Sequence, residues 1–419
     1  MTVRLVRGLL LDTAPLRESP AFRRIWIGGG LSSIGGQMTS FAVLLQVFRL
    51  THSSLSVGLV GLAIALPAIL LALAGGAIVD ATDRRKVVLI ATSVQVAVSA
   101  TLAAQAFVDL GQVWLLYALV AIQSAVAAVN APARRTFMPT LLRRDQLPAG
   151  AALQMLTTHG SLTIGPAVAG VITALLGLKS CYLIDALSFG FALYGVARLP
   201  PLLPGGGSGR PGLRTIAEGL RFVGRSRAVL GAFLADMSVT FLGMPIALFP
   251  AVNAARFGGN PVTLGLMTTA VAAGGILGSA LSGPASRIRR QGLGMLVAGA
   301  VWGVGLIGFG LSGAFPLAFS ALVVAGAGDV TAVVLRTALV QGLTPGPLRG
   351  RVSAAEHAVG AGVPQLGNFR AGVVASLTSA GAGAVIGGVT VVAAALAIGA
   401  CVPGFVAFRS PATDRVALA

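Results

Sequence analysis

The stretch Gly76-Ala77-Ile78-Val79-Asp80-Ala81-Thr82-Asp83-Arg84-Arg85-Lys86 places a compact group of charged residues between two long apolar segments. The chain repeats this setting in its second half, where Arg287, Arg289 and Arg290 follow another long apolar segment. Short charged segments between apolar segments long enough to cross a bilayer indicate a chain that passes repeatedly through a membrane.

The composition supports the same class of protein. The chain has 419 residues, of which 55% are hydrophobic and only 10% are charged, whereas about 25% of the residues in a soluble domain are charged. Its 57 glycines suit helices that pack closely in lipid. The net charge of +18 would also suit nucleic acid, but the charges lie in short loops between apolar segments. We therefore expect this protein to reside in a lipid bilayer and to bind no nucleic acid.

The apolar segments predict an all-α membrane protein with twelve transmembrane helices. A helix needs about 20 apolar residues to cross the bilayer, and unpaired backbone is not tolerated in hydrocarbon. The expected spans are 25–47, 57–79, 87–108, 113–133, 149–174, 180–198, 229–252, 262–284, 292–311, 316–335, 353–378 and 383–405.

The distribution of basic residues predicts the orientation. With the N-terminus inside, most of the 30 Lys and Arg residues fall in cytoplasmic segments, and only Arg49, Lys179 and Arg256 fall in expected outer loops. Both termini are therefore predicted to be cytoplasmic. The expected division is a lead-in at 1–24, a six-helix bundle at 25–198, a linker at 199–228, a six-helix bundle at 229–405 and a tail at 406–419.

The two halves resemble each other in their loops. Arg135-Thr136 follows the fourth expected span, and Arg336-Thr337 follows the tenth. Two repeated six-helix halves are typical of secondary transporters, whose substrate site lies at the midplane between the halves. We interpret the linker as a flexible chain followed by a basic, partly amphipathic segment that lies near anionic headgroups. The alternative is a regulatory docking site.

These features resemble a major facilitator superfamily transporter, with Gly76, Asp80, Arg84 and Arg85 at the expected spacing after the second span. Several blocks along the chain are similar to the bacterial enterobactin-exporter-like branch, which includes macrolide-efflux-like proteins. These blocks are 50–54 with 57–59, 77–80 with 84–87, 154–157 and 348–352.

The resemblance implies a cytoplasmic gate made of Gly76, Asp80, Arg84 and Arg85. Glu356 lies near the inner end of span eleven, and from this position we expect it to pair at the gate. The carboxylate of Asp80 would lie at a helix N-terminus of the opposite half, for which we expect the start of span eleven near 351–353. The alternative is that the basic residues only set the topology.

The sequence departs from the family pattern at three positions. Ala81 and Asp83 stand where the gate motif usually has Arg and Gly, so part of the charge network differs. Val120 stands where the fourth span usually has an Arg, which weakens a proton-relay role for that span.

Ionisable groups at membrane depth are functional candidates by default. Asp236 and Asp329 are candidates for proton coupling, because a carboxylate in a cavity takes up and releases a proton in each cycle; the alternative is a structural ion pair. His159 is the third candidate, with substrate contact or an interhelical hydrogen bond as alternatives.

Four further polar residues lie near the middle of expected spans and are candidates for the substrate cavity: Gln37, Gln123, Asn368 and Arg370. Arg370 would either pair with one of the aspartates or receive an anionic group of the ligand. Asp185, near the outer end of span six, is predicted to be structural.

No enzyme site is expected. The chain has no Gly-x-x-x-x-Gly-Lys-Ser/Thr loop for ATP, and its three His and two Cys residues lack metal-site spacing. Glycine pairs such as Gly274-Gly275 are better explained by close helix contact than by phosphate binding.

The sequence thus favours a monomeric, multi-pass transporter of the bacterial cytoplasmic (inner) membrane with no cofactor besides a proton gradient. The expected function is proton-driven export of a small amphipathic molecule, either a siderophore or a hydrophobic drug, by alternating access. The alternatives are an uptake permease for a small solute and a non-transporting receptor or scaffold with the same fold.

Overall fold

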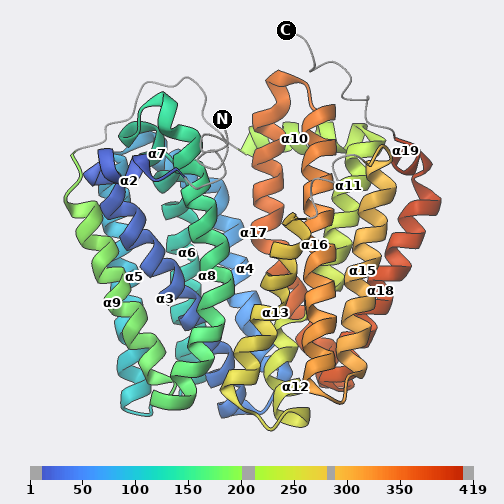
Figure 1. Ribbon diagram of the computed structural model, residues 1–419, viewed down its shortest axis with the longest axis horizontal. Coiled ribbons are helices and arrows are strands. Elements are labelled where there is room, and N and C mark those ends of the chain that lie inside the picture. Colours follow the sequence, from blue (N-terminus) through green and yellow to red (C-terminus); the bar gives the residue numbers. More distant parts are fainter. Residues whose placement is uncertain (1–11, 201–212, 281–287, 409–419) are drawn as a thin grey trace, which may run out of the picture. The chain divides into compact units, whose positions relative to one another are not determined.

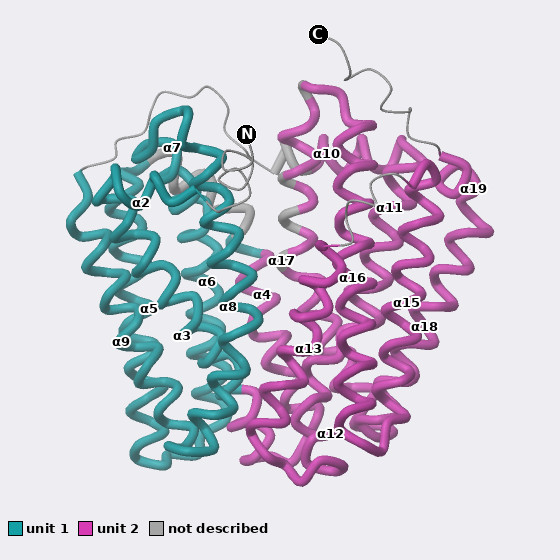
Figure 2. Tube along the Cα trace, viewed as in Figure 1, with its two compact units in different colours: residues 1–43, 70–210 teal, residues 44–69, 211–419 magenta. Residues whose placement is uncertain are grey.

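The computed structural model describes residues 12–200, 213–280 and 288–408. Side chains are not described at 72–81, 213–216, 347, 354, 357, 358 and 361. Within the described residues the regular elements are all helical (Figure 1). Contacts between Cα atoms divide the chain into two compact units: residues 1–43 with 70–210 form unit 1, and residues 44–69 with 211–419 form unit 2 (Figure 2).

The N-terminal half of the chain begins with long helices joined by short turns (Figure 1). Two of them, α3 and α4, each contribute to both units, because residues 44–69 group with unit 2. The elements are α2 (Ala14–Glu18), α3 (Pro20–Thr51), α4 (Ser54–Ala81), α5 (Arg84–Phe107), α6 (Val113–Arg135), α7 (Phe137–Leu141), η1 (Arg144–Gln146), α8 (Leu147–Leu176) and α9 (Lys179–Ala197).

Unit 2 contains the remaining helices. They are α10 (Leu213–Arg225), α11 (Arg227–Met237), η2 (Ser238–Leu242), η3 (Ile246–Leu248), α12 (Phe249–Arg256), α13 (Pro261–Ala280), α15 (Gln291–Leu311), α16 (Phe315–Leu343), α17 (Gly346–Leu377), α18 (Ala380–Cys401) and α19 (Pro403–Val406). A buried apolar cluster that includes Phe233, Met295, Leu335 and Phe405 joins α11, α15, α16 and α19.

Eleven helices of the described residues are long and apolar enough to cross a membrane. The expected spans therefore fall on observed helices, with one difference. Helix α17 has 32 residues but is less apolar than the others, because Arg349, Arg351, Glu356 and Arg370 lie on it. The number twelve, the division into domains and the cytoplasmic placement of the termini stay predictions.

Glycine allows close helix contact in unit 2, as predicted for Gly274. A Cβ added at Gly274 on α13 would collide with the Val323 carbonyl oxygen on α16. Reciprocally, a Cβ at Gly326 on α16 would collide with the carbonyl oxygen of Val271 on α13. The two backbones therefore pack against each other as small-residue interfaces in lipid do.

The seventh expected span, 229–252, is not one continuous helix. The α-helix α11 ends at Met237, η2 forms a π-helical turn, and the backbone is irregular at 243–245 before η3 and α12 follow. Gly243 and Pro245 explain the break: glycine is a poor helix former, and proline removes a backbone donor. The predicted span coincides with Arg227–Arg256, which is long and apolar enough to cross a membrane, but its helix is interrupted.

Candidate functional site

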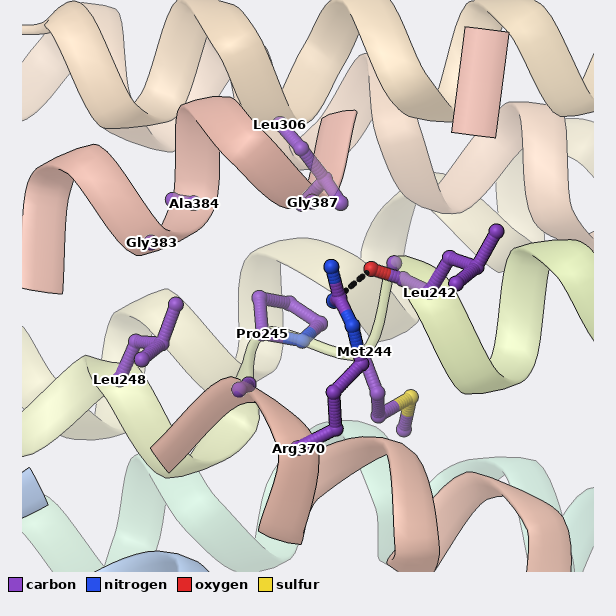
Figure 3. Close-up of a pocket in the computed structure, with 11 residues that line it drawn as sticks. Leu242, Met244, Pro245, Leu248, Leu306, Arg370, Gly383, Ala384 and Gly387 are labelled. Carbon is purple, nitrogen blue, oxygen red and sulfur yellow. Dashed lines mark hydrogen bonds between the residues drawn. The ribbon is translucent and has the colours of Figure 1, made fainter. Parts of the chain in front are cut away.

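The break after α11 is tolerated because side chains bind the backbone groups that it frees. The Arg370 guanidinium of α17 donates a hydrogen bond to the Leu242 carbonyl oxygen (Figure 3). The Trp302 indole of α15 donates to the Gly243 carbonyl oxygen at 3.1 Å, and the Asn368 side-chain oxygen accepts from the Ala247 amide at 3.2 Å. Backbone at membrane depth persists when protein groups satisfy it in this way.

A narrow pocket with no room for a water molecule lies beside this break, entirely within unit 2. Arg370 is its charged lining residue, and the rest of the lining comes from residues 242–245, Leu248, Leu306, Ala371, Gly383, Ala384 and Gly387 (Figure 3). Arg370 forms no ion pair with a described carboxylate, so the expectation that it pairs with one of the aspartates was wrong. Its partners are the Leu242 carbonyl oxygen and, at 3.5 Å, the Thr390 hydroxyl.

A cluster of charges joins α11, α16 and α17, and we call it the acidic cluster: Asp236, Asp329, Arg336 and Glu356. Arg336 forms a hydrogen-bonded ion pair with Asp236, and its Nε atom lies 3.9 Å from Glu356 Oε1. Asp329 lies two helical turns before Arg336 on α16 and interacts electrostatically with both Asp236 and Arg336.

The acidic cluster is largely shielded from solvent. The side chains of Arg336, Asp236 and Glu356 are 19%, 13% and 23% exposed. Three carboxylates therefore share one guanidinium in surroundings of low dielectric constant, where unbalanced charge is costly. Such a cluster can redistribute its pairing when one carboxylate binds a proton.

The structure thus brings together three residues that the sequence singled out separately, Asp236, Asp329 and Glu356. The residue that joins them, Arg336, was missed as a site residue and interpreted only as a cytoplasmic charge. A signal was present, since Arg336-Thr337 is the pair that repeats Arg135-Thr136.

The basic residues at the start of α5 are bound within unit 1. Asp83 caps α5 by accepting a hydrogen bond from the Arg85 amide at 2.9 Å. The Arg85 guanidinium donates to the carbonyl oxygen of Ala197 at 2.7 Å, where a cation is stabilised by the C-terminal end of α9. Gly76 and Asp80 lie on α4, but their side chains are outside the described set, so the gate formed with Arg84 stays a prediction.

Helix α17 begins at Gly346, upstream of the start expected near 351–353. Arg351 therefore lies inside the helix, where its guanidinium pairs with Glu218 of α10 at 2.7 Å. A Cβ at Gly219 would collide with the Arg351 carbonyl oxygen, so α10 packs directly on α17. The C-terminal part of the expected linker is thus a docked helix, while 201–212 lies outside the described residues.

The other candidates of unit 1 are spread over different helices. His159 on α8 is exposed. Gln37 on α3 packs against Gly165 of α8, where an added Cβ would lie 2.5 Å from the Gln37 Cβ. Gln123 on α6 is half-buried. A shared site for these residues stays a prediction.

A metal centre is not apparent in the described part of the chain, where no group of three or more His, Cys, Asp and Glu side chains is placed to hold an ion.

A model of the transmembrane secretion effector family matches residues 12–415. The chain therefore belongs to this family of the major facilitator superfamily. It is a multi-pass membrane transporter rather than an enzyme, as the sequence predicted.

Among curated relatives, the enterobactin exporter of Shigella boydii is 27% identical over 390 residues, covering 91% of this chain and 93% of the relative. The same values hold for an enterobactin exporter of Escherichia coli. The resemblance to the enterobactin-exporter-like branch is confirmed.

Solved structures share the fold. A point mutant of the nucleoside transporter NupG gives a TM-score of 0.75 at 12% identity, covering 91% of this chain and 99% of that chain. A bacterial homologue of the iron transporter ferroportin, in an inward-facing state, gives 0.68 at 15% identity, covering 90% and 98%. These neighbours support the major facilitator fold.

Proposed function

We propose that this chain is a secondary transporter that exports a small amphipathic molecule across the bacterial inner membrane by proton-coupled alternating access. It would act as a monomer of twelve spans in two six-helix bundles with both termini in the cytoplasm, and would need no cofactor besides the proton gradient. The observation that carries the proposal is the acidic cluster, in which one guanidinium is shared by carboxylates from three helices of unit 2.

Proton binding in the acidic cluster would change how three helices are held together. When Asp236 takes up a proton, its ion pair with Arg336 weakens, and Arg336 is left with Glu356 and Asp329 as charged partners. Because Asp236 lies on α11 just before the helix break, the change reaches a segment whose backbone is already irregular. A proton would therefore bias the arrangement of α11 against α16 and α17.

Export is favoured by the curated relatives, which are named as enterobactin exporters. We take enterobactin, a siderophore, as the first test substrate and the hydrophobic cation ethidium as the second. Gly76, Asp80, Arg84 and Arg85 would form the cytoplasmic gate. Gln37, Gln123, Asn368 and Arg370 remain candidates for the substrate cavity, although Asn368 and Arg370 already bind the backbone at the helix break.

The test uses purified protein in proteoliposomes with an imposed pH gradient. We expect enterobactin flux that depends on the gradient, and proton release when enterobactin is added to the protein in detergent. Asp236→Asn or Asp329→Asn should abolish proton release while enterobactin still binds. His159→Gln tests the third candidate, and Asp145→Asn, an exposed carboxylate paired with Arg143, is the matched control.

Binding without proton release in the wild type would contradict proton coupling. Unchanged release in both aspartate variants would show that the acidic cluster is only a structural ion pair. Flux in the opposite direction under the same gradient would favour an uptake permease, and binding of both probes without flux would favour a receptor.

A further inference from the structure

Unit 1 contains a carboxylate that is completely buried and forms no ion pair with a cation of the described residues. Asp185 on α9 is 0% exposed. The hydroxyl groups of Thr39 on α3 and Ser99 on α5 both donate hydrogen bonds to its Oδ2 atom, each at 2.7 Å. Its Oδ1 atom is buried and has no hydrogen-bond partner among the described residues. A buried carboxylate in this state is costly while it stays ionised.

The titratable groups on the surrounding helices do not compensate this charge. On α9 itself, Cys181 and Tyr182 precede Asp185 by about one turn and are buried. The charged groups of α3 and α5 lie at the helix ends, where they are Arg23, Arg24, Arg49, Arg84, Arg85 and Lys86, and α8 carries the exposed His159. Helix α9 begins at Lys179, and the Arg134 guanidinium of α6 donates a hydrogen bond to Thr92 of α5 at 3.4 Å. None of these described groups forms an ion pair with Asp185.

Buried polar side chains extend from Asp185 along α5. Thr92, Gln95 and Ser99 are all buried, and their spacing of three and four residues places them on one face of the helix. Gln95 accepts a hydrogen bond from Asn130 of α6 at 3.1 Å. We call Thr92, Gln95, Ser99 and Asn130 the polar file. From Thr92 to Ser99 it rises by about 10 Å along the helix axis.

Two buried side-chain oxygens at this file have no hydrogen-bond partner among the described residues, whereas the other unpartnered buried atoms are Nε atoms of arginines. The buried side-chain oxygens without a partner are Asp185 Oδ1 and Asn130 Oδ1. An oxygen in that position requires a donor, which water or a proton supplies. Both acceptors lie at this file, where a water molecule or a proton would satisfy them.

The space around Asp185 favours a proton over a metal ion. A Cβ added at Gly35 of α3 would lie 2.6 Å from Asp185 Oδ1, so the α3 backbone already lies against this oxygen. A hard cation needs several oxygen ligands around it, whereas a proton bonds to a lone pair of Oδ1 and adds almost no volume.

We propose that Asp185, with Thr39 and Ser99, is a proton-binding site inside unit 1 that exchanges protons along the polar file of Ser99, Gln95, Asn130 and Thr92. The proton bonds to Asp185 Oδ1, turns the carboxylate into a neutral carboxylic acid and returns to water when the acid ionises. The site is separate from the acidic cluster of unit 2. Its use during transport rests on the proposed function, but the binding of the proton does not.

Infrared difference spectroscopy of the purified protein after a pH change tests the site directly. We expect a carbonyl stretching component of a buried carboxylic acid that shifts on labelling with [13C]aspartate, is lost in Asp185→Asn and remains in Asp236→Asn and Asp329→Asn. The matched control Asp145→Asn should keep the band. Thr39→Val and Ser99→Ala should each move its frequency, because each removes one hydrogen bond to the carboxyl group, and Thr39→Ser should restore it. These hydroxyl variants keep the test decisive if Asp185→Asn does not fold.

The polar file is tested by the rate at which the band responds. Gln95→Leu and Asn130→Leu should slow the response to a pH jump without abolishing the band. A carbonyl spectrum that is the same in Asp185→Asn as in the wild type, or the same in Thr39→Val and Ser99→Ala as in the wild type, overturns the proton site. An unchanged rate in both file variants overturns the route.

Transport is measured separately. If Asp185 binds a transported proton, Asp185→Asn lowers the number of protons moved per enterobactin while the substrate still binds. If the wild type moves no protons, the proton coupling of the proposed function fails, although the infrared result still decides whether Asp185 binds a proton. A normal proton count in a variant that has lost the band would show that Asp185 is protonated but does not take part in transport.

Discussion

Arg336 and Asp236, which lie one hundred residues apart in the sequence, form a hydrogen-bonded ion pair between α16 and α11. The same guanidinium faces Glu356 of α17. Arg336 therefore links its own helix, α16, to α11 and α17.

Replacing Arg336 by Ala should destabilise the protein, because it leaves Asp236, Asp329 and Glu356 together without a cation. Breaking a buried pair on one side costs about 3–5 kcal/mol, and partial exposure of these side chains places the expected loss near the lower end. The midpoint of thermal unfolding in detergent measures it. Arg336→Lys should recover part of the loss, whereas Arg143→Ala, whose pair with Asp145 is exposed, should leave the midpoint unchanged. An equal midpoint for Arg336→Ala and the wild type would contradict the assignment.

Arg370→Met should loosen the helix break while preserving most of the side-chain volume. The Leu242 carbonyl oxygen then loses its donor, which costs about 1–3 kcal/mol for a buried group. Hydrogen–deuterium exchange of the peptide that covers 243–248 should become faster, and Arg370→Lys should restore part of the protection. Exchange as slow as in the wild type would mean that the break does not depend on Arg370.

Gly274→Leu should destabilise unit 2, because the added side chain meets the backbone of α16 at Val323. Overpacking of this kind costs about 1–3 kcal/mol. The control is Gly160→Ala on α8, where an added Cβ has no neighbour within 4 Å and helix propensity favours Ala by about 1 kcal/mol. The midpoint of thermal unfolding should fall for Gly274→Leu and stay the same or rise for Gly160→Ala. A midpoint that falls for Gly160→Ala but not for Gly274→Leu would contradict close packing of α13 on α16.

Gly219→Val should release α10 from α17, because the Arg351 carbonyl oxygen occupies the space that the new side chain needs. Faster hydrogen exchange over 217–225 and easier proteolysis near the helix are expected. Glu218→Gln removes the ion pair with Arg351, whose side chain is 45% exposed, and leaves the backbone contact at Gly219 in place, so it should have a much smaller effect. If both variants behave alike, the ion pair rather than the backbone contact holds α10.

Much of the helical architecture could be predicted from the amino-acid sequence. The length and spacing of the apolar segments predicted helices at the observed positions, because each helix must bury its own backbone groups in lipid and the signal is therefore local. The predictions for Gly274 and for the family depended on local patterns as well.

The errors arose where distant residues decide the local structure. Span seven contains Gly243 and Pro245, but whether such a segment stays helical depends on donors and acceptors from other helices, here Arg370, Trp302 and Asn368. The start of α17 and the docking of α10 likewise depend on contacts between separate elements.

The sequence by itself determined that this is a multi-helix membrane transporter, because apolar length, charge placement and motif spacing are properties of consecutive residues. Only the tertiary structure decided which polar residues meet: Arg336 with Asp236 and Glu356, Arg370 with the Leu242 carbonyl, and Asp185 with two hydroxyls. The physical reason is that the free energy of a buried charge depends on partners within a few ångströms, and those partners lie far away in the sequence.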